Sequence, residues 1–158
     1  MAPQNSDSPT ETGTSNASMT RAEIVAMFER RQAAYDDLDA AVLAEDYADE
    51  CIVDSPTGGT HSGKPAVQKV LQAVFNAFLD MKVRTDSLVI DGDHVAQTMT
   101  VEGTNIGGFL GLAPSGKPFH LSAVFLYELK DRKIVRERRI YDFTGMLTQI
   151  GVLKTKPV

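Results

Sequence analysis

Apolar residues repeat with a helical period near the middle of the chain. Between Ser62 and Phe78 they recur at i, i+3, i+4, i+7, i+8 and i+11, at Val67, Val70, Leu71, Val74, Phe75 and Phe78. This spacing places them on one wide stripe of a helix. Pro65 suits the first turn of such a helix, where its missing amide hydrogen is no loss. The pattern predicts a helix that buries one face.

The second half of the chain alternates with a period of two, which is typical of strands. Strands are expected over residues 83–90 and 95–104, joined by the turn Asp91-Gly92-Asp93, with Met99 on the same side as Val95 and Val101. The glycine-rich segment 105–117 predicts a loop. A long strand then carries one apolar face made of Phe119, Leu121, Ala123, Phe125 and Tyr127. A turn at 130–132 leads to a last strand that runs through Ile140.

The N-terminal part reads as a tail followed by helices. Residues 1–19 are mostly small and polar, so they predict a disordered tail, and residues 20–154 predict one folded domain. Thr20 and Glu23 form a capping-box pattern that begins a helix ending near Tyr35. A short second helix that includes Tyr47 and a short strand over residues 51–54 follow. Near the other end, Asp142 or Thr144 can cap a short helix that carries Met146.

These elements predict an α+β fold. Strands with one apolar face need another layer to cover it. Three N-terminal helices are expected to pack on one face of a curved, mixed or antiparallel sheet that wraps around them, with a short C-terminal helix at its end. Any binding site should lie between the two layers.

Composition narrows the classes of function. The 158 residues are 42% hydrophobic, which suffices for one core, and the formal net charge is −5. An acidic chain without a concentrated basic face argues against a nucleic-acid partner. No apolar run approaches the ~20 residues of a membrane helix. Cys51 is the single cysteine, so no intrachain disulfide can form, which fits a cytoplasmic protein.

Four polar residues are candidates for acid/base chemistry. Asp54 ends the first strand, and burial in an apolar site would raise its pKa toward the range of a useful base; capping of its own turn is the alternative. Arg138 shares a predicted strand face with Ile134 and Ile140, where it would bind a substrate oxyanion or Asp54; a surface pair with Glu128 or Glu137 is the alternative. His61 and His120 are candidates for proton transfer because histidine is the side chain that can change its charge near neutral pH. His120 faces the pocket only if a bulge at Pro118 reverses the strand.

The remaining candidates would shape a hydrophobic substrate pocket. They are aromatic, thioether or amide side chains on the predicted inner faces: Tyr35, Tyr47, Phe75, Phe78, Met99, Asn105, Phe119, Phe125 and Met146. No cluster of His, Asp and Glu has the spacing of a metal site. The phosphate-binding patterns GxGxxG and GxxxxGK[ST] are both absent. We therefore expect no metal and no cofactor.

The order of elements resembles the cone-shaped fold of the nuclear transport factor 2-like superfamily, and within it the SnoaL-like polyketide cyclases. The resemblance covers roughly residues 21–153. It is carried by GTNIGGFLGLAPSGK, KIVRERRIYDFTGMLTQIG and DSPTGGTHSGKPAV. It implies a hydrophobic pocket between sheet and helices and a homodimer, which the apolar outer face around Val124 and Leu126 also favours.

The chain departs from three mechanisms of that superfamily. Asn105 stands where the cyclases carry a pocket His, and Phe119 stands where an ungapped match places their acidic Asp. Limonene epoxide hydrolases have an Asp at the place of Ile140 and an Arg-x-Asp pair within residues 99–101, and ketosteroid isomerases an Asp near the place of Phe125. An amide orients a carbonyl but does not move protons near neutral pH.

Two hypotheses follow. The first is a cofactor-independent enzyme that uses general acid/base chemistry on a hydrophobic cyclic or aromatic oxygenated molecule, as a cyclase, isomerase, dehydratase or carbon–carbon lyase. In it Asp54 takes a proton, Arg138 and Asn105 hold an oxyanion, and His61 or His120 returns the proton. The second is a non-catalytic module for hydrophobic-ligand binding or dimerisation.

Overall fold

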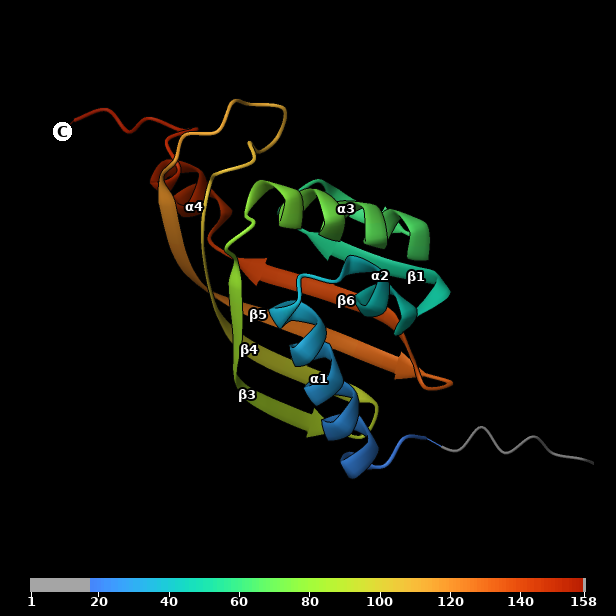
Figure 1. The fold of residues 1–158 in the computed structure, drawn as a ribbon. Helices are drawn as coiled ribbons and strands as arrows, with labels where there is room; N and C mark the ends of the chain where they lie inside the picture. The colour runs from blue at the N-terminus through green and yellow to red at the C-terminus, as the bar shows by residue number, and fades with distance from the viewer. Residues whose placement is uncertain (1–17, 158) are drawn as a thin grey trace, which may run out of the picture.

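Six strands and four helices build residues 18–157, which are the residues that this computed structural model describes (Figure 1). The elements in chain order are α1 (Arg21–Asp36), α2 (Ala40–Glu45), β1 (Tyr47–Ser55), β2 (Gly59–Ser62), α3 (Lys64–Ala77), β3 (Lys82–Asp91), β4 (His94–Thr104), β5 (Pro118–Lys130), β6 (Lys133–Tyr141) and α4 (Phe143–Gln149). The predicted α+β class is confirmed.

The strands form one mixed sheet in the order β2-β1-β6-β5-β4-β3. β1 runs parallel to β6, and every other neighbouring pair is antiparallel. Helices α1, α2 and α3 lie on one side of the curved sheet, while α4 lies at its end beside the long loop between β4 and β5 (Figure 1). The hydrophobic core therefore fills the space between the three helices and the inner face of the sheet.

Local sequence signals set the helix starts. The Thr20 hydroxyl accepts from the backbone N–H of Glu23 at 3.2 Å, and the Glu23 carboxylate accepts from the backbone N–H of Thr20 at 2.9 Å, so the predicted capping box is confirmed. Pro65 lies in the first turn of α3. The Asp142 carboxylate caps α4 by accepting from the backbone N–H of Gly145 at 2.8 Å. These contacts satisfy amides that a first helical turn leaves without partners.

Two boundaries differ from the sequence prediction. α2 ends at Glu45, and Tyr47 opens β1 instead of continuing the helix. β1 is longer than the predicted strand because Tyr47, at its start, pairs with Ile134 of β6. β2, over a segment for which no strand was predicted, forms a hairpin with β1 and pairs His61 with Val53. Strand partners decide these elements, and local propensity does not report them.

A bulge in β6 sets which of its side chains face inward. Leu129 of β5 pairs with Ile134 of β6, but the next β5 residue, Glu128, pairs with Arg136, so β6 contains one extra residue. An extra residue reverses the alternation beyond it. Ile134 faces inward before the bulge, and Glu137 and Arg139 face inward after it. The inner face of β6 is therefore charged.

The disordered tail predicted for residues 1–19 lies almost entirely outside the described residues. Within residues 18–157, no helix has the length and apolar character needed to cross a bilayer.

Candidate functional site

A cavity of about 90 Å³ lies between α3 and the inner face of β3 to β6, with α4 at its end. Most of its lining is apolar: Leu71, Val74, Phe75, Met81, Val83, Met99, Val101, Phe109, Phe119, Leu121, Ala123, Phe125 and Met146. The polar members are Tyr35, Thr57, Arg139 and Tyr141. Among the described residues, no Asp, Glu or His side chain lines this cavity. The cavity is thus an apolar space with one cation and three hydroxyl groups in its wall.

Arg139 is the charged group of this cavity. Its residue exposure is only 8%, and its Nε donates to Oε1 of Glu137 at 2.6 Å. Its guanidinium carbon lies 5.1 Å from the centroid of the Phe125 ring. The buried Nη2 has no hydrogen-bond partner within residues 18–157. The guanidinium group is fixed on two sides and still carries unused N–H donors.

Arg139 stays charged at any ordinary pH. Burial opposes its charged form, but the neighbouring Glu137, Tyr47 and Tyr35 hold the pKa of Arg139 well above its usual value. An arginine in a site of low polarity is a strong donor to an anionic oxygen, because charge-assisted hydrogen bonds gain strength when water is excluded.

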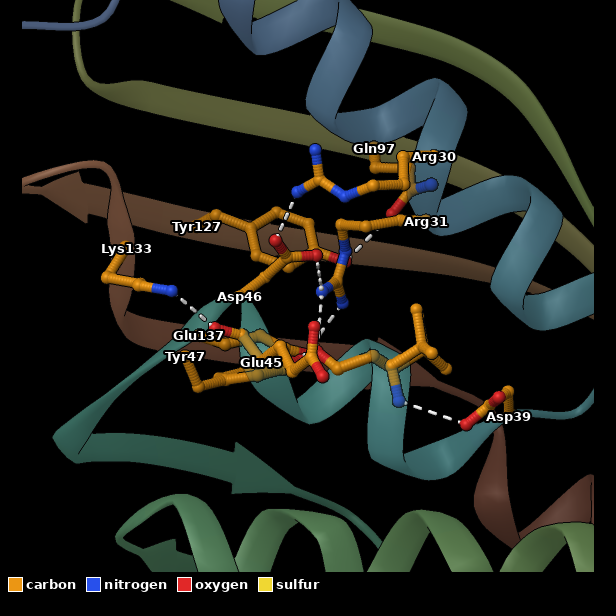
Figure 2. Close-up of polar contacts among 12 residues, drawn as sticks. Arg30, Arg31, Asp39, Glu45, Asp46, Tyr47, Gln97, Tyr127, Lys133 and Glu137 are labelled. Carbon is orange, nitrogen blue, oxygen red and sulfur yellow. Dashed lines mark hydrogen bonds and ion pairs between the residues drawn. The ribbon is translucent and has the colours of Figure 1, made fainter.

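A buried polar network supports Glu137 from behind (Figure 2). Glu137 accepts a short hydrogen bond from the Tyr47 hydroxyl, which itself accepts from Nη2 of Arg31 at 3.2 Å. Nη1 of Arg31 donates to Asp46 at 3.2 Å and to the carbonyl oxygen of Leu43 at 3.1 Å. Figure 2 shows these side chains converging from α1, from the turn after α2, from the start of β1 and from β6. The network thus connects α1, β1 and β6 and holds the carboxylate that positions Arg139.

Cations outnumber anions in this network. Arg30 and Arg31 share the carboxylate of Asp46, while Arg139 pairs with Glu137. Two carboxylates therefore serve three guanidinium groups, of which only that of Arg30 is largely exposed, with 57% of its side-chain surface accessible. The surplus cation is therefore the solvent-exposed Arg30, and the buried part of the network is balanced.

A cluster of hydroxyl groups forms the second polar part of the cavity wall. The Tyr141 hydroxyl lies 2.6 Å from Oγ1 of Thr57 and 3.4 Å from Oγ of Ser55. Oγ of Ser55 also accepts from the backbone N–H of Thr57 at 3.1 Å. Tyr141 lies two residues after Arg139 on β6, so both side chains point to the same face. The parallel pairing of β1 with β6 brings Ser55 and Thr57 to this end of the sheet.

Six of the nine residues expected to shape the pocket line this cavity: Tyr35, Phe75, Met99, Phe119, Phe125 and Met146. The other three do not line it. Tyr47 belongs to the buried network, and the Phe78 ring packs 4.8 Å from Phe119 and 5.2 Å from Phe109. Asn105 is fully buried, where it holds the base of the β4–β5 loop through Ser115 and Lys117.

Arg138 lies outside the cavity. The expectation that it shares a buried face with Ile134 and Ile140 is wrong, because Ile134 is fully buried while Ile140 is 46% exposed and Arg138 is exposed. The bulge in β6 separates Ile134 from the alternation of the residues that follow. Glu137, expected as a surface partner, is fully buried. The inward arginine is Arg139.

Asp54 also faces away from the cavity. Its neighbours Val53 and Ser55 are the buried residues at the end of β1. The Asp54 carboxylate accepts from the Thr60 hydroxyl at 2.8 Å and lies 3.5 Å from Nη2 of Arg136. It pairs with Arg138 only through the backbone register of β1 and β6. The structure therefore does not bring Asp54 and Arg138 to the cavity.

The two candidate histidines lie at different places. His61 is partly buried and does not line the cavity. Its Nε2 donates at 3.0 Å to the carbonyl oxygen of Thr57, which does line it. His120 is exposed on the outer side of β5, and its backbone is bound by the Gln149 side chain of α4. No bulge at Pro118 turns His120 inward, because β4 and β5 pair without interruption there.

Sequence reasoning missed three of the four polar residues of the lining: Thr57, Arg139 and Tyr141. A signal for Tyr141 was present, since it continues the last strand one step beyond Ile140. No signal marked Arg139 over Arg138, because the bulge depends on pairing with β5. In the described part of the chain, no three His, Cys, Asp or Glu side chains are grouped so that they could hold a metal ion.

The fold and the cavity define a cone-shaped α+β protein with an internal apolar cavity. The sequence profile of the family described as SnoaL-like polyketide cyclase matches residues 25–150. The chain belongs to this family, whose predicted resemblance is thereby confirmed. No curated protein sequence matches the chain.

Solved structures share the fold. TsrD from Streptomyces laurentii is 24% identical, with a TM-score of 0.75, and the match covers 85% of this chain and 99% of TsrD. AclR from Streptomyces galilaeus is 22% identical, with a TM-score of 0.74 and 87% of each chain covered. Wild-type IdmH from Streptomyces antibioticus is 26% identical, with a TM-score of 0.65, and the match covers 80% of this chain and 97% of IdmH.

Proposed function

We propose that this protein is a cofactor-independent enzyme that stabilises an oxyanion formed from a hydrophobic cyclic or aromatic oxygenated molecule. One observation carries the proposal: the guanidinium group of Arg139 forms part of an apolar cavity wall with N–H donors that nothing in the described chain uses. A buried donor without a partner destabilises a fold by about 1–3 kcal/mol. Such a cost is retained where a ligand supplies the missing acceptor. Family membership supports an enzymatic role.

Arg139 performs the electrostatic part of the reaction. A carbonyl oxygen placed against its guanidinium group gains negative charge when a neighbouring carbon loses a proton, as in enolisation, cyclisation or dehydration. Donors fixed before the reaction stabilise this charge without reorganisation, and one such donor contributes roughly 10²- to 10³-fold in rate. Glu137 and Phe125 provide that fixation.

Tyr141 moves the proton in this proposal. Its hydroxyl is hydrogen-bonded to Thr57 and lies in the cavity wall, so it can donate to the substrate and be reprotonated through the Ser55–Thr57 hydroxyls. The lining contributed by residues 18–157 contains no carboxylate, so the rate gain comes from stabilising the oxyanion, and water accepts the proton that leaves carbon. Asp54 and Arg138 have no part in this scheme because they face away from the cavity.

Proton exchange tests the proposal without knowledge of the natural substrate. The protein is incubated in D₂O with 2-tetralone, an enolisable aromatic ketone, and loss of the α-proton signals is followed by NMR. We expect the protein to accelerate exchange at the carbon next to the carbonyl. Arg139→Lys, which keeps a cation for Glu137, should lower that acceleration by roughly 10- to 100-fold because the planar donor fork is lost.

Arg138→Gln is the matched control, since it removes a guanidinium group from the neighbouring, exposed position. It should leave the exchange rate unchanged. Equal losses in both variants would contradict the proposal, because a general effect of charge would then explain them.

The second candidate is a non-catalytic module that binds a hydrophobic ligand. The observation that favours it is the lack of any Asp, Glu or His in the described lining of the cavity. The binding-module hypothesis predicts tight binding of aromatic ligands without any acceleration of α-proton exchange. The same NMR samples therefore decide between the two.

A further inference from the structure

The polar groups of the cavity are distributed unevenly. Arg139 and Tyr141 come from the inner face of β6, and Thr57 follows β1, which pairs with β6. The wall formed by α3 and β4 is apolar, with Phe75 and Met99 among its members. A ligand that fills this space needs one polar edge and one hydrocarbon edge.

The charge at the polar edge points to an anion. The buried guanidinium groups of Arg31 and Arg139 are paired with Asp46 and Glu137, but Nη2 of Arg139 is buried without a partner in residues 18–157. A neutral acceptor would satisfy this N–H group, whereas an anionic acceptor would also form a stronger, charge-assisted hydrogen bond. A carboxylate provides that bond, and it matches the planar geometry of a guanidinium group.

The second polar group sets a distance. Arg139 and Tyr141 are two residues apart on β6, which places their Cα atoms about 7 Å apart on the same face. This separation is close to the width of one aromatic ring with its substituents. The ligand therefore carries a second oxygen on the same edge, within reach of the Tyr141–Thr57 hydroxyl pair.

We propose that the cavity binds a cyclic or aromatic acid as its anion, with the carboxylate against Arg139 and a second oxygen substituent against Tyr141 and Thr57. This proposal names the substrate class of the proposed function and depends on the same cavity. It goes beyond an oxygenated hydrophobic molecule because it requires a negative charge before any reaction begins.

Three naphthalene derivatives test it: 2-naphthamide, 2-naphthoate and 7-hydroxy-2-naphthoate, which carries both oxygen groups on one edge. The sequence contains no Trp, so naphthalene fluorescence can be followed without an indole background. At pH 7.5 we expect 2-naphthoate to bind roughly 10- to 100-fold more tightly than the isosteric amide, as a charge-assisted hydrogen bond implies. The 7-hydroxyl group should add a further several-fold.

Matched variants assign the effects. Arg139→Lys should reduce the preference for naphthoate over naphthamide, whereas Arg138→Gln should preserve it. Tyr141→Phe should remove the gain from the 7-hydroxyl group and leave the preference for the carboxylate. Retention of that preference in Arg139→Lys and in Arg139→Gln, with both variants folded by circular dichroism, would overturn the proposal.

The results separate this inference from the proposed function. Equal binding of amide and acid, together with accelerated ketone exchange, overturns the anionic ligand and retains the enzyme. Selective binding of the acid without ketone exchange supports the anionic ligand and overturns the enzyme in favour of the binding module. Failure of all three compounds to bind overturns the inference, and lack of exchange in the same samples overturns the proposed function as well.

Discussion

Nε of Arg139 donates to Oε1 of Glu137 at 2.6 Å, although the two residues are only two positions apart on the same strand. Both side chains are buried on the inner face of β6, where a sheet normally places apolar residues. The pair lies between two environments, with the Tyr47–Arg31 network on one side and the apolar cavity on the other. Glu137 is part of the buried network that stabilises the fold, and Arg139 links this network to the cavity.

Glu137→Gln removes the charge of this carboxylate with little change of shape. Arg139 and Arg31 then remain buried near one another without the negative charge of Glu137, so we expect the free energy of unfolding to fall by about 3–5 kcal/mol. Urea unfolding followed by circular dichroism measures the loss. Glu128→Gln, at an exposed position of β5, should change stability by less than about 0.5 kcal/mol. A loss below about 1 kcal/mol in Glu137→Gln would show that the carboxylate does not stabilise the network.

Tyr141→Phe separates chemistry from stability. It removes a hydroxyl that lies 2.6 Å from Thr57 but keeps the aromatic ring against Phe143. We expect a stability loss of only about 0.5–1.5 kcal/mol. Ketone exchange should fall by roughly 100-fold, because general acid catalysis contributes at least that much. Thr57→Val is the companion variant, and an unchanged exchange rate in both would remove Tyr141 from the mechanism.

Three buried tyrosines predict a loss of stability at alkaline pH. Burial, as the largest cause, raises the pKa of Tyr35, Tyr47 and Tyr127 in the folded protein. Unfolded tyrosines ionise near pH 10, so the folded state binds more protons than the unfolded state above that pH. Their contribution is therefore fully present below about pH 10 and is lost as the pH rises. Each contributes up to about 1.4 kcal/mol per pH unit to the slope.

Urea unfolding at pH 8, 9, 10 and 11 measures this slope. Tyr127→Phe should lower the stability at neutral pH, because Gln97 loses a 2.8 Å hydrogen bond, and should also make the alkaline slope shallower by about one proton. A free energy of unfolding that stays level between pH 9 and 11 would contradict the prediction.

The sequence predicted most elements because their signals are local. The capping box at Thr20 and the stripe around Phe75 identified helices, and the alternation from Phe119 to Tyr127 identified the inner face of β5. Strand pairing was not predictable. β2 owes its conformation to the hairpin with β1, and the start of β1 owes its conformation to the distant strand β6.

The site was predicted on its apolar side and not on its polar side. The β5–β6 hairpin pairs Lys130 with Lys133 and Leu129 with Ile134, and only then does the bulge shift the register. Counting from the turn without that bulge places Arg138 inward and Arg139 outward. A single unpaired residue thus moved the predicted cation to the wrong face. For Asp54 the signal was available, since the apolar alternation of Cys51 and Val53 already assigned it to the outer face.

Asp54→Asn tests whether Asp54 is the catalytic base that the sequence predicted or a residue outside the site, as its position in the structure indicates. The carboxylate pairs with Arg136 at 3.5 Å with 37% of its side-chain surface exposed, and an exposed pair of this kind contributes about 0–1 kcal/mol. We expect a small stability change, unchanged naphthoate binding and unchanged ketone exchange. Thermal unfolding, fluorescence and NMR check these three outcomes. A tenfold or larger loss of exchange in a folded variant would restore Asp54 as the base.

The outer face of β5 and β6 predicts a homodimer. Leu126 and Ile140 are 39% and 46% exposed there, and the pairing of Val124 with Ile140 and of Leu126 with Arg138 makes them neighbours on one surface. A second copy of the chain would bury this patch, and size-exclusion chromatography with light scattering should report twice the chain mass of 17.2 kDa.

The double variant Leu126→Lys and Ile140→Lys should be monomeric, because four lysines would meet in the interface of a symmetric pair. Leu79→Lys is the control, since Leu79 is 62% exposed and lies between α3 and β3, away from this surface. If the Leu79→Lys variant were also monomeric, or if the wild-type protein were monomeric, the exposed residues of β5 and β6 would not form a dimer interface.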